Sequence, residues 1–261
     1  MIVKKYAYKA ALVGLGSLLS MGLSVSASLA NSTPGATSSA KENSRGTLRQ
    51  GLPGRRLGGG TRGDRVFSDA YAYLAALVTS DNLSQTTAAQ PTLLFSVPSL
   101  ISAEDAEFIL RNREGEEVYR TNFSLNSEAG LVSLDLSETD ISPLEIDQDY
   151  RWYFTIVTDA NDRARDVAVH GNIRRVKSDY QLASWAEMNA TSVETQVTDI
   201  EALYKEGGLW HDAAVALHTL RQIHPDNAAI VDEWNRLISF AGLSAVLQPA
   251  APAVKVVLKP H

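Results

Sequence analysis

The spacing of apolar residues changes once along the chain, near Asp179, and this change restricts the fold more than any other feature. From Tyr71 to Val176 apolar and polar residues alternate, which is typical of half-buried β-strands. After Asp179 the apolar residues recur every three or four positions, which is typical of amphipathic helices. We therefore predict a mainly β protein with an added α part: a β-sandwich domain over residues 66–177 and a helical region over residues 178–247.

About seven short strands are predicted in the β domain, at the spacing expected of a β-sandwich. The clearest is YRWYFTIV, which begins at Tyr150, and a hairpin is predicted over residues 106–125 around the turn Asn112–Gly115. The segment SPLEIDQDYRWYFTIVTD resembles the approach to the sixth strand of immunoglobulin-like and fibronectin-like domains. In such a domain Tyr150 would be a tyrosine corner, with its hydroxyl bonded to upstream backbone. We therefore expect an immunoglobulin/fibronectin-like sandwich.

The helical region is expected to begin with two helices separated by Gly207 and Gly208, the second of which ends at Pro225. A further helix is predicted from about Ala228 to Ala241. The first two helices are similar to one tetratricopeptide-type hairpin in the positions of Tyr204, Gly208, Trp210, Ala213, Leu217 and Pro225. Because a solenoid needs about three repeats, we expect a short helical appendage and not a superhelix.

The first thirty residues are typical of a cleavable secretory signal peptide. A positive start with Lys4, Lys5 and Lys9 precedes an apolar run over residues 11–25, which is shorter than the roughly 20 residues that span a bilayer. Small residues at Ser28–Ala30 predict cleavage after Ala30, and Val25–Ala27 offers a second site. We expect export to the periplasm or outer envelope, or secretion, with no transmembrane segment left after cleavage.

The chain contains no cysteine. An exported protein without cysteine must be stabilised by burial alone, and it offers neither thiolate nucleophiles nor thiolate metal ligands. This composition favours a bacterial envelope protein. Nucleic acid is not an expected partner in that compartment.

Charge is unevenly distributed along the chain. Residues 31–65 carry seven Lys/Arg and two Asp/Glu, whereas residues 66–261 carry fourteen and twenty-eight. Residues 31–50 are predicted to be a flexible linker, because they lack large apolar side chains. Residues 51–65, GLPGRRLGGGTRGDR, form an Arg/Gly-rich arm whose free amides and guanidinium groups favour either anion binding or docking on the acidic body.

The predicted contacts to an anionic partner are the four arginines of this arm: Arg55, Arg56, Arg62 and Arg65. The expected partner is an anionic envelope polymer or an unknown envelope protein. At the other end of the chain, residues 248–261 are predicted to be a loose tail.

No motif predicts a catalytic residue, a metal site or a cofactor. Residues 58–63 match GxGxxG, but no strand is predicted before them, as dinucleotide binding requires. His211 and His218 lie seven residues apart, about 10 Å along a helix axis, which is too far to share one zinc ion. HExxH and GxSxG motifs are absent. The sequence leaves an enzyme open as an alternative, but it names no residues for one.

Several segments together resemble a cyanobacterial domain-of-unknown-function family, the one numbered nine hundred and twenty-eight. The resemblance runs in order from about Gly51 to Leu243, through GLPGRRLGGGTRGD, QPTLLFSVP, AEFILRNREGEEVYRTNFSL, YRWYFTIVTD, LYKEGGLWHDAAVALHTLR and EWNRLISFAGL. Members often carry a cysteine near the position of Arg65, and this chain has none. The resemblance implies an exported cyanobacterial protein and supplies no activity.

The leading functional hypothesis is a non-enzymatic binding or interaction module of the cell envelope. The alternative is a carbohydrate-binding or carbohydrate-processing envelope protein, because an outward Tyr153, together with Tyr71 and Tyr73, could stack on sugar rings. A third hypothesis is an assembly factor that pairs with a partner through an uncharged edge strand.

Overall fold

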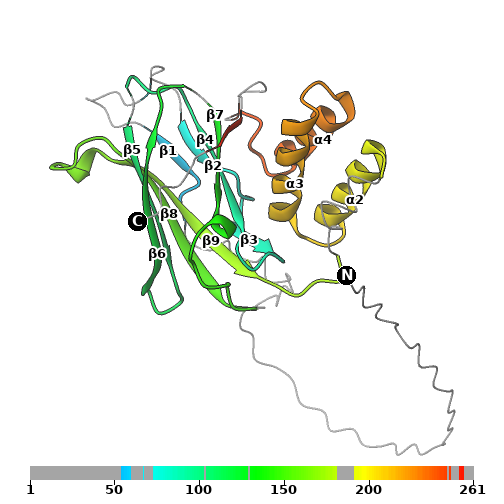
Figure 1. The fold of residues 1–261 in the computed structure, drawn as a ribbon, viewed down its shortest axis with the longest axis horizontal. Coiled ribbons are helices and arrows are strands. Elements are labelled where there is room, and N and C mark those ends of the chain that lie inside the picture. Colours follow the sequence, from blue (N-terminus) through cyan, green and yellow to red (C-terminus); the bar gives the residue numbers. More distant parts are fainter. Residues whose placement is uncertain are drawn as a thin grey trace, which may run out of the picture. The chain divides into compact units, whose positions relative to one another are not determined.

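Ten strands and three α-helices make up the part of the chain that the computed structural model describes (Figure 1). This part comprises residues 54–59, 67, 73–102, 104–128, 130–180, 191–245, 247 and 253–255. All of it belongs to one unit, Thr47–His261. The predicted signal peptide and linker lie outside the described residues.

The strands form two five-stranded sheets that share one hydrophobic core. The first sheet has the order β1 (Leu57–Gly59), β2 (Tyr73–Ala76), β4 (Thr92–Val97), β7 (Gly130–Asp135) and β10 (Ala253–Lys255). The second has the order β3 (Leu83–Thr86), β9 (Val167–Arg175), β8 (Asp149–Val157), β5 (Glu104–Arg111) and β6 (Glu117–Leu125). Two short 3-10 turns, η1 (Leu136–Glu138) and η2 (Arg163–Arg165), follow β7 and β8.

The core between the sheets follows from the alternation in the sequence. In β8 every second side chain is buried, and Trp152 and Phe154 are fully buried. Phe95 of the first sheet stacks on Phe154 with ring centroids 4.2 Å apart and meets Trp152 edge-on at 5.6 Å. The outward residues of β8 are half-buried, so the second sheet presents a polar outer face.

The predicted hairpin and the predicted bond of Tyr150 are both present. Strands β5 and β6 pair antiparallel around a turn in which Gly115 adopts a φ of +86°, the left-handed conformation that favours glycine. The side-chain oxygen of Asn112 accepts from the backbone N–H of Glu116 at 2.8 Å. The Tyr150 hydroxyl accepts from the backbone N–H of Glu145 at 3.1 Å and so ties the start of β8 to the chain before it.

The three predicted helices are confirmed as α2 (Val193–Lys205), α3 (Trp210–Ile223) and α4 (Ala228–Phe240). Side-chain caps fix the starts of two of them: Ser192 accepts from the N–H of Thr195, and Asn227 from that of Ile230, both at 3.3 Å.

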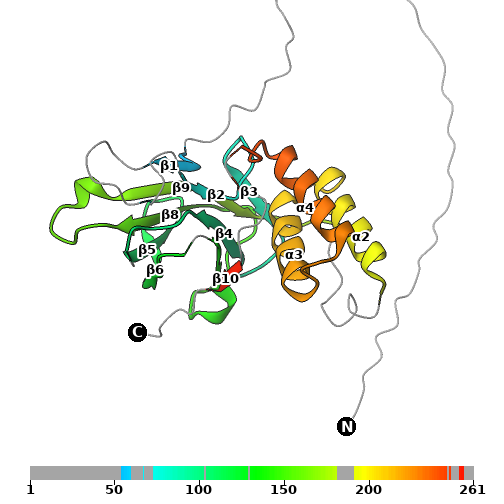
Figure 2. The ribbon, with the colours of Figure 1, turned by 90° about the horizontal axis from the view of Figure 1, so that it is seen from above.

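The helices cover the first sheet on the side opposite the second sheet (Figures 1 and 2). Leu77, Leu94 and Leu131 point away from the inter-sheet core and join one hydrophobic cluster with the apolar faces of α2, α3 and α4. Hydrogen bonds anchor the helical layer, because the carboxylate of Asp212 accepts from both the N–H and the hydroxyl of Thr87 at 2.8 Å. The resulting order is sheet, sheet, helices.

Part of the predicted arm is built into the fold. Arg55 and His170 exchange two backbone hydrogen bonds of 2.9 Å at the edge of β9, and the chain then crosses to the first sheet as β1. A side chain at Gly58 would place its Cβ 2.8 Å from the carbonyl oxygen of Ala168, so glycine permits this close crossing. Of the two alternatives for the arm, the structure therefore favours, for residues 54–59, docking on the rest of the protein.

Two further strands were not predicted. Strand β3 is short, and its sequence, LSQT, has no strong apolar alternation. Strand β10 lies in the predicted loose tail, and that expectation is wrong for Ala253–Lys255, which pair in parallel with Leu131–Ser133. Among the described residues, no helix is both long and apolar enough to cross a membrane.

Candidate functional site

A cluster of cationic and aromatic side chains lies on the outer face of the second sheet. Tyr153 of β8 is the register partner of His170 of β9, and Arg151 of β8 is the partner of Arg111 of β5. Arg55 faces His170 across the edge of β9. Because partners in an antiparallel pair point to the same side of a sheet, these five side chains share one face. They are called the basic face below.

Tyr153 is the centre of the basic face. The His170 ring stacks on it with centroids 5.6 Å apart and an interplanar angle of 30°, and the Arg111 guanidinium carbon lies over its ring at 5.6 Å. Because β8 lies between β9 and β5, the imidazole and the guanidinium approach from opposite flanks. Protein groups thus occupy the positions that the sugar-stacking hypothesis reserved for a ligand at Tyr153. Of the other two tyrosines in that hypothesis, Tyr73 is exposed and Tyr71 lies outside the described residues.

The charges of the basic face change the pKa of His170. Burial, and then the positive charges of Arg151 and Arg55, lower the pKa of His170 below its usual 6.5. Within the described chain, two buried nitrogens of the basic face have no hydrogen-bond partner, Nδ1 of His170 and Nε of Arg111. Both atoms are buried, so a ligand on this face would contact the other nitrogens of these two side chains.

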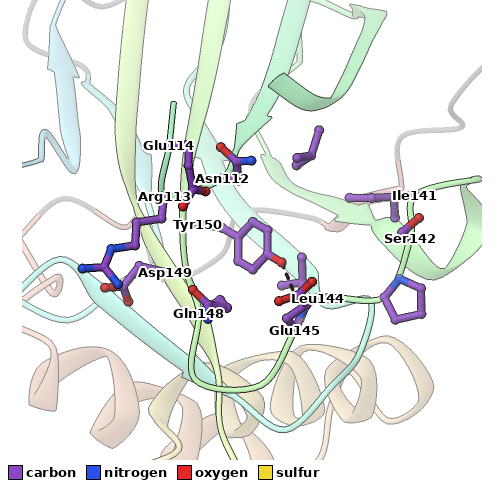
Figure 3. Close-up of a pocket in the computed structure, with 12 residues that line it drawn as sticks. Asn112, Arg113, Glu114, Ile141, Ser142, Leu144, Glu145, Gln148, Asp149 and Tyr150 are labelled. Atoms are coloured by element: carbon purple, nitrogen blue, oxygen red, sulfur yellow. Dashed lines mark hydrogen bonds between the residues drawn. The ribbon is translucent and has the colours of Figure 1, made fainter. Parts of the chain in front are cut away.

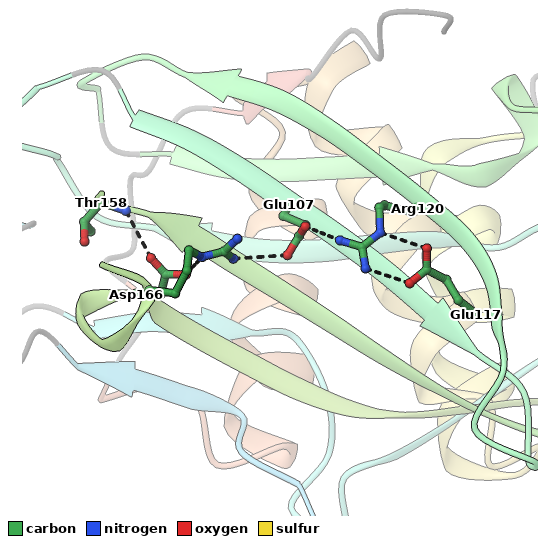
Figure 4. Close-up of polar contacts among 6 residues, drawn as sticks. Glu107, Glu117, Arg120, Thr158 and Asp166 are labelled. Carbon is green, nitrogen blue, oxygen red and sulfur yellow. Dashed lines mark hydrogen bonds and ion pairs between the residues drawn. The ribbon is translucent and has the colours of Figure 1, made fainter. Parts of the chain in front are cut away.

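Beside the basic face, the same sheet carries a chain of ion pairs (Figure 4). Arg120 donates to both carboxylate oxygens of Glu117, at 2.8 and 2.7 Å, and also pairs with Glu107. Arg163 pairs with Glu107 at 3.2 Å and with Asp166. The whole set, called the ion network below, is Glu107, Glu117, Arg120, Arg163 and Asp166.

The ion network satisfies its charges internally. The hydrogen bond between Arg120 and Glu117 raises the pKa of Arg120. The hydrogen bond between Arg163 and Asp166 likewise raises the pKa of Arg163. Asp166 also accepts from the backbone N–H of Thr158 at 3.3 Å, which joins the network to the start of the β8–β9 connection. The arginines of the network therefore already have the carboxylate partners that an anionic ligand would otherwise supply.

The structure separates the four arginines predicted to bind an anion. Arg55 lies on the basic face. The side chain of Arg56 leaves in the other direction and donates to the carbonyl oxygens of Ala241, at 2.7 Å, and Val78, at 3.4 Å, where it ties the end of α4 to the β layers. Arg62 and Arg65 lie outside the described residues. Anion binding by this set stays a prediction.

Three residues of the basic face were not predicted as a site: Arg111, Arg151 and His170. The alternation of the sequence places each of them on the outer side of its strand. It does not say which strands are neighbours. The register that brings β9, β8 and β5 side by side is a long-range property, because β5 and β9 are separated by about fifty residues of chain.

A second candidate is a pocket of about 500 Å³ at one end of the second sheet, where the β5–β6 turn meets the segment before β8 (Figure 3). Asp149 in its wall is held by Arg174 through two hydrogen bonds of 2.6 and 2.8 Å. The lining is mixed, with carboxylates, amides, a guanidinium and apolar groups: Asn112, Arg113, Glu114, Val118, Ile141, Ser142, Pro143, Leu144, Glu145, Gln148, Asp149 and Tyr150. Such a lining can bond the hydroxyl groups of a polar organic ligand.

The two histidines considered as metal ligands belong to the helical layer. Both are buried, and burial lowers the pKa of His211 and lowers that of His218 to about 4. His218 contacts the side-chain amide of Gln222 at 3.1 Å. Over the described residues, no group of three or more His, Asp or Glu side chains is placed to hold a metal ion.

The fold defines a mixed β and α protein, with two sheets in contact and three helices on the C-terminal side. The chain belongs to the family described as Domain of Unknown Function (DUF928), which matches residues 57–250. This confirms the family resemblance seen in the sequence. No curated protein matches the chain.

Among solved structures, the chain matches the crystal structure of Bacteroides uniformis β-glucuronidase. The identity is 13%, the match covers 38% of this chain and 12% of that chain, and the TM-score is 0.22. The match therefore spans a small part of a much longer protein, and it carries no argument about fold or function.

Proposed function

We propose that this protein is a non-enzymatic binding module of the cell envelope that is exported and that holds an anionic polymer on the basic face. The observation that carries the proposal is the placement of Arg55, Arg111, Arg151 and His170 on one sheet face together with Tyr153. Guanidinium groups form strong, directional hydrogen bonds with carboxylate, sulfate and phosphate oxygens.

The charge of the whole chain makes this face selective. The chain has a formal net charge of −6, so a polyanion is repelled by the net charge and attracted where arginines gather. A polymer with regularly spaced charges would also contact several arginines at once. Since each further contact is then intramolecular, weak individual bonds add to a useful affinity.

The finer fold assignment is part of the proposal. The second sheet runs β9-β8-β5-β6 with β3 parallel to β9, and the first runs β2-β4-β7. This order supports an immunoglobulin/fibronectin-like sandwich, whose strands G, F and C share one sheet and whose strands A, B and E share the other. The helical pair α2 and α3 supports the tetratricopeptide-like hairpin. Domains of the sandwich type commonly bind through sheet faces and loops, and a fold alone does not fix the ligand.

The binding proposal is tested with purified protein and immobilised polymers. Dextran sulfate and polygalacturonate should bind, and uncharged dextran should not. Binding should weaken as salt is raised from 50 to 300 mM, since salt screens charges that are exposed to solvent. Equal binding to charged and uncharged polymers would refute the proposal.

Export has its own test. The resemblance of residues 1–30 to a signal peptide predicts a mature chain that begins after Ala30, and the same sequence supports an envelope address. Cell fractionation followed by N-terminal sequencing of the mature protein should give Asn31 as the first residue. An N-terminus at Met1 in the cytoplasmic fraction would refute export.

The second candidate function is carbohydrate binding or processing, and the pocket beside Tyr150 favours it (Figure 3). Amide and carboxylate side chains such as Gln148 and Glu114 can bond sugar hydroxyls in pairs. A panel of neutral oligosaccharides at millimolar concentration tests this. Binding that is lost in Gln148→Ala but kept in Arg111→Ala would assign it to the pocket and not to the basic face.

A further inference from the structure

The imidazole of His170 lies among positive charges at the edge of the basic face. From β8 it faces Tyr153 and Arg151, and from the crossing segment it faces Arg55. The two neighbours on its own strand that share its side, Ala168 and Asn172, are not titratable. Both charges that act on the ring are thus cationic, and they oppose a third positive charge at this position.

This environment keeps the ring neutral in the unliganded protein at neutral pH. An anion placed among the same arginines reverses the balance, because an opposite charge within a few ångströms favours the protonated imidazole. A protonated ring has N–H groups on both nitrogens, so it can donate to the ligand from Nε2, whereas Nδ1 is buried. Ligand binding and proton binding therefore assist each other at this face.

Resting on the proposed function, we infer that the ligand presents an oxyanion to the basic face and that binding protonates His170, so that a proton is taken up and affinity rises as the solution becomes more acidic. The oxyanion is held beside His170, which has Arg55 as its bridge partner on one side and β8 with Arg151 on the other, and the Tyr153 ring fixes the imidazole by stacking on it. A sulfate ester, a phosphate or a carboxylate all satisfy this chemistry.

The size of the effect follows from linkage. A ligand that raises the proton affinity of a group by one pKa unit binds up to roughly tenfold more tightly once the pH is below the lower of the two values. For His170 the relevant range lies below its usual value of 6.5. Between pH 7.5 and 5.5 we expect the dissociation constant to fall by about three- to tenfold.

The test is isothermal titration calorimetry of the full chain with three polymers: dextran sulfate, polygalacturonate and polyphosphate. Each titration is run at pH 7.5 and 5.5, in two buffers of different ionisation enthalpy, so that proton uptake is measured directly. Dextran sulfate is the cleanest probe, since its sulfate esters stay ionised across this range. Circular dichroism at both pH values checks that the protein is folded.

The informative variant is His170→Gln, and the matched control is His224→Gln, which changes an exposed histidine at the end of α3. The wild type and the control should bind more tightly at pH 5.5 and take up protons. His170→Gln should still bind, with neither proton uptake nor the three- to tenfold gain. The polymer that binds most tightly identifies the oxyanion.

The outcomes separate this inference from the function it rests on. If the wild type binds a polymer equally at both pH values, or if His170→Gln keeps the full pH dependence, the role of His170 is wrong and the binding function stands. If the wild type binds none of the three polymers at either pH, the proposed function itself is refuted.

Discussion

The basic face and the ion network lie side by side on the same sheet and use the same residue type in opposite ways. In the ion network, Arg120 and Arg163 share the carboxylate of Glu107, and each has a second carboxylate partner as well. On the basic face, Arg111 packs on Tyr153 and its Nε has no hydrogen-bond partner among the described residues, while Arg55 and Arg151 lower the pKa of His170.

The difference shows where a ligand can gain binding energy. An anion that approached the ion network would have to replace carboxylates that already neutralise its arginines. An anion at the basic face instead relieves repulsion between like charges.

The largest effect is expected from reversing charge on the basic face. Arg111→Glu combined with Arg151→Glu should weaken dextran sulfate binding about a hundredfold or more, because two charge-assisted contacts are each worth roughly 1.5–3 kcal/mol. The matched control is Arg120→Glu with Arg163→Glu, which changes net charge equally within the ion network. Its affinity should change less than threefold in the same calorimetric titration, and an equal loss in both would show that only net charge matters.

The second prediction concerns the pH dependence of folding stability, which we assign to the buried histidines, whereas the pH dependence of binding is assigned to His170. The unfolded chain protonates His218 near its usual pKa of 6.5, whereas the folded chain does so only near 4. Stability is thus fully present above 6.5 and is lost as the pH falls toward 4, by roughly 2 kcal/mol between pH 7.5 and 5. Urea unfolding across this range measures it. His218→Gln should flatten the slope while the pH dependence of binding remains.

The adjacent residues Arg55 and Arg56 provide a third comparison. Arg56→Ala removes the bonds to Ala241 and Val78 and should lower the free energy of unfolding by about 1–2 kcal/mol without weakening polymer binding. Arg55→Ala should do the reverse, weakening binding about threefold with little change in the melting temperature. If both variants behave alike, the assignment of these two arginines to different tasks is wrong.

The smallest effect is expected from removing one carboxylate of the ion network, which leaves its arginines less neutralised. Glu107→Gln removes the carboxylate that Arg120 and Arg163 share, so polymer binding should strengthen by roughly twofold. The stability change should stay within about 1 kcal/mol, because both arginines are nearly half exposed and each keeps its second carboxylate partner. Affinity that fell in this variant would show that the network itself is part of the binding surface.

Local sequence patterns predicted the three helices, the β5–β6 hairpin and the hydroxyl bond of Tyr150, because each depends on residues close in the chain. Strand β3 escaped prediction, since its four residues carry little local signal and gain their stability from pairing with β9. Strand β10 was not predicted either, since its three residues carry little local signal and pair with the distant strand β7.

Of the candidate site, the sequence alone supplied Arg55 and the outward direction of Tyr153. The alternation of side chains along a strand is a local property, so one chain is enough to read it. The tertiary structure decided that His170 and Arg111 both contact Tyr153, and that Arg56 turns inward to the end of α4 while Arg55 stays outside. Register between distant strands sets these neighbours, and it is fixed by the packing of the whole core.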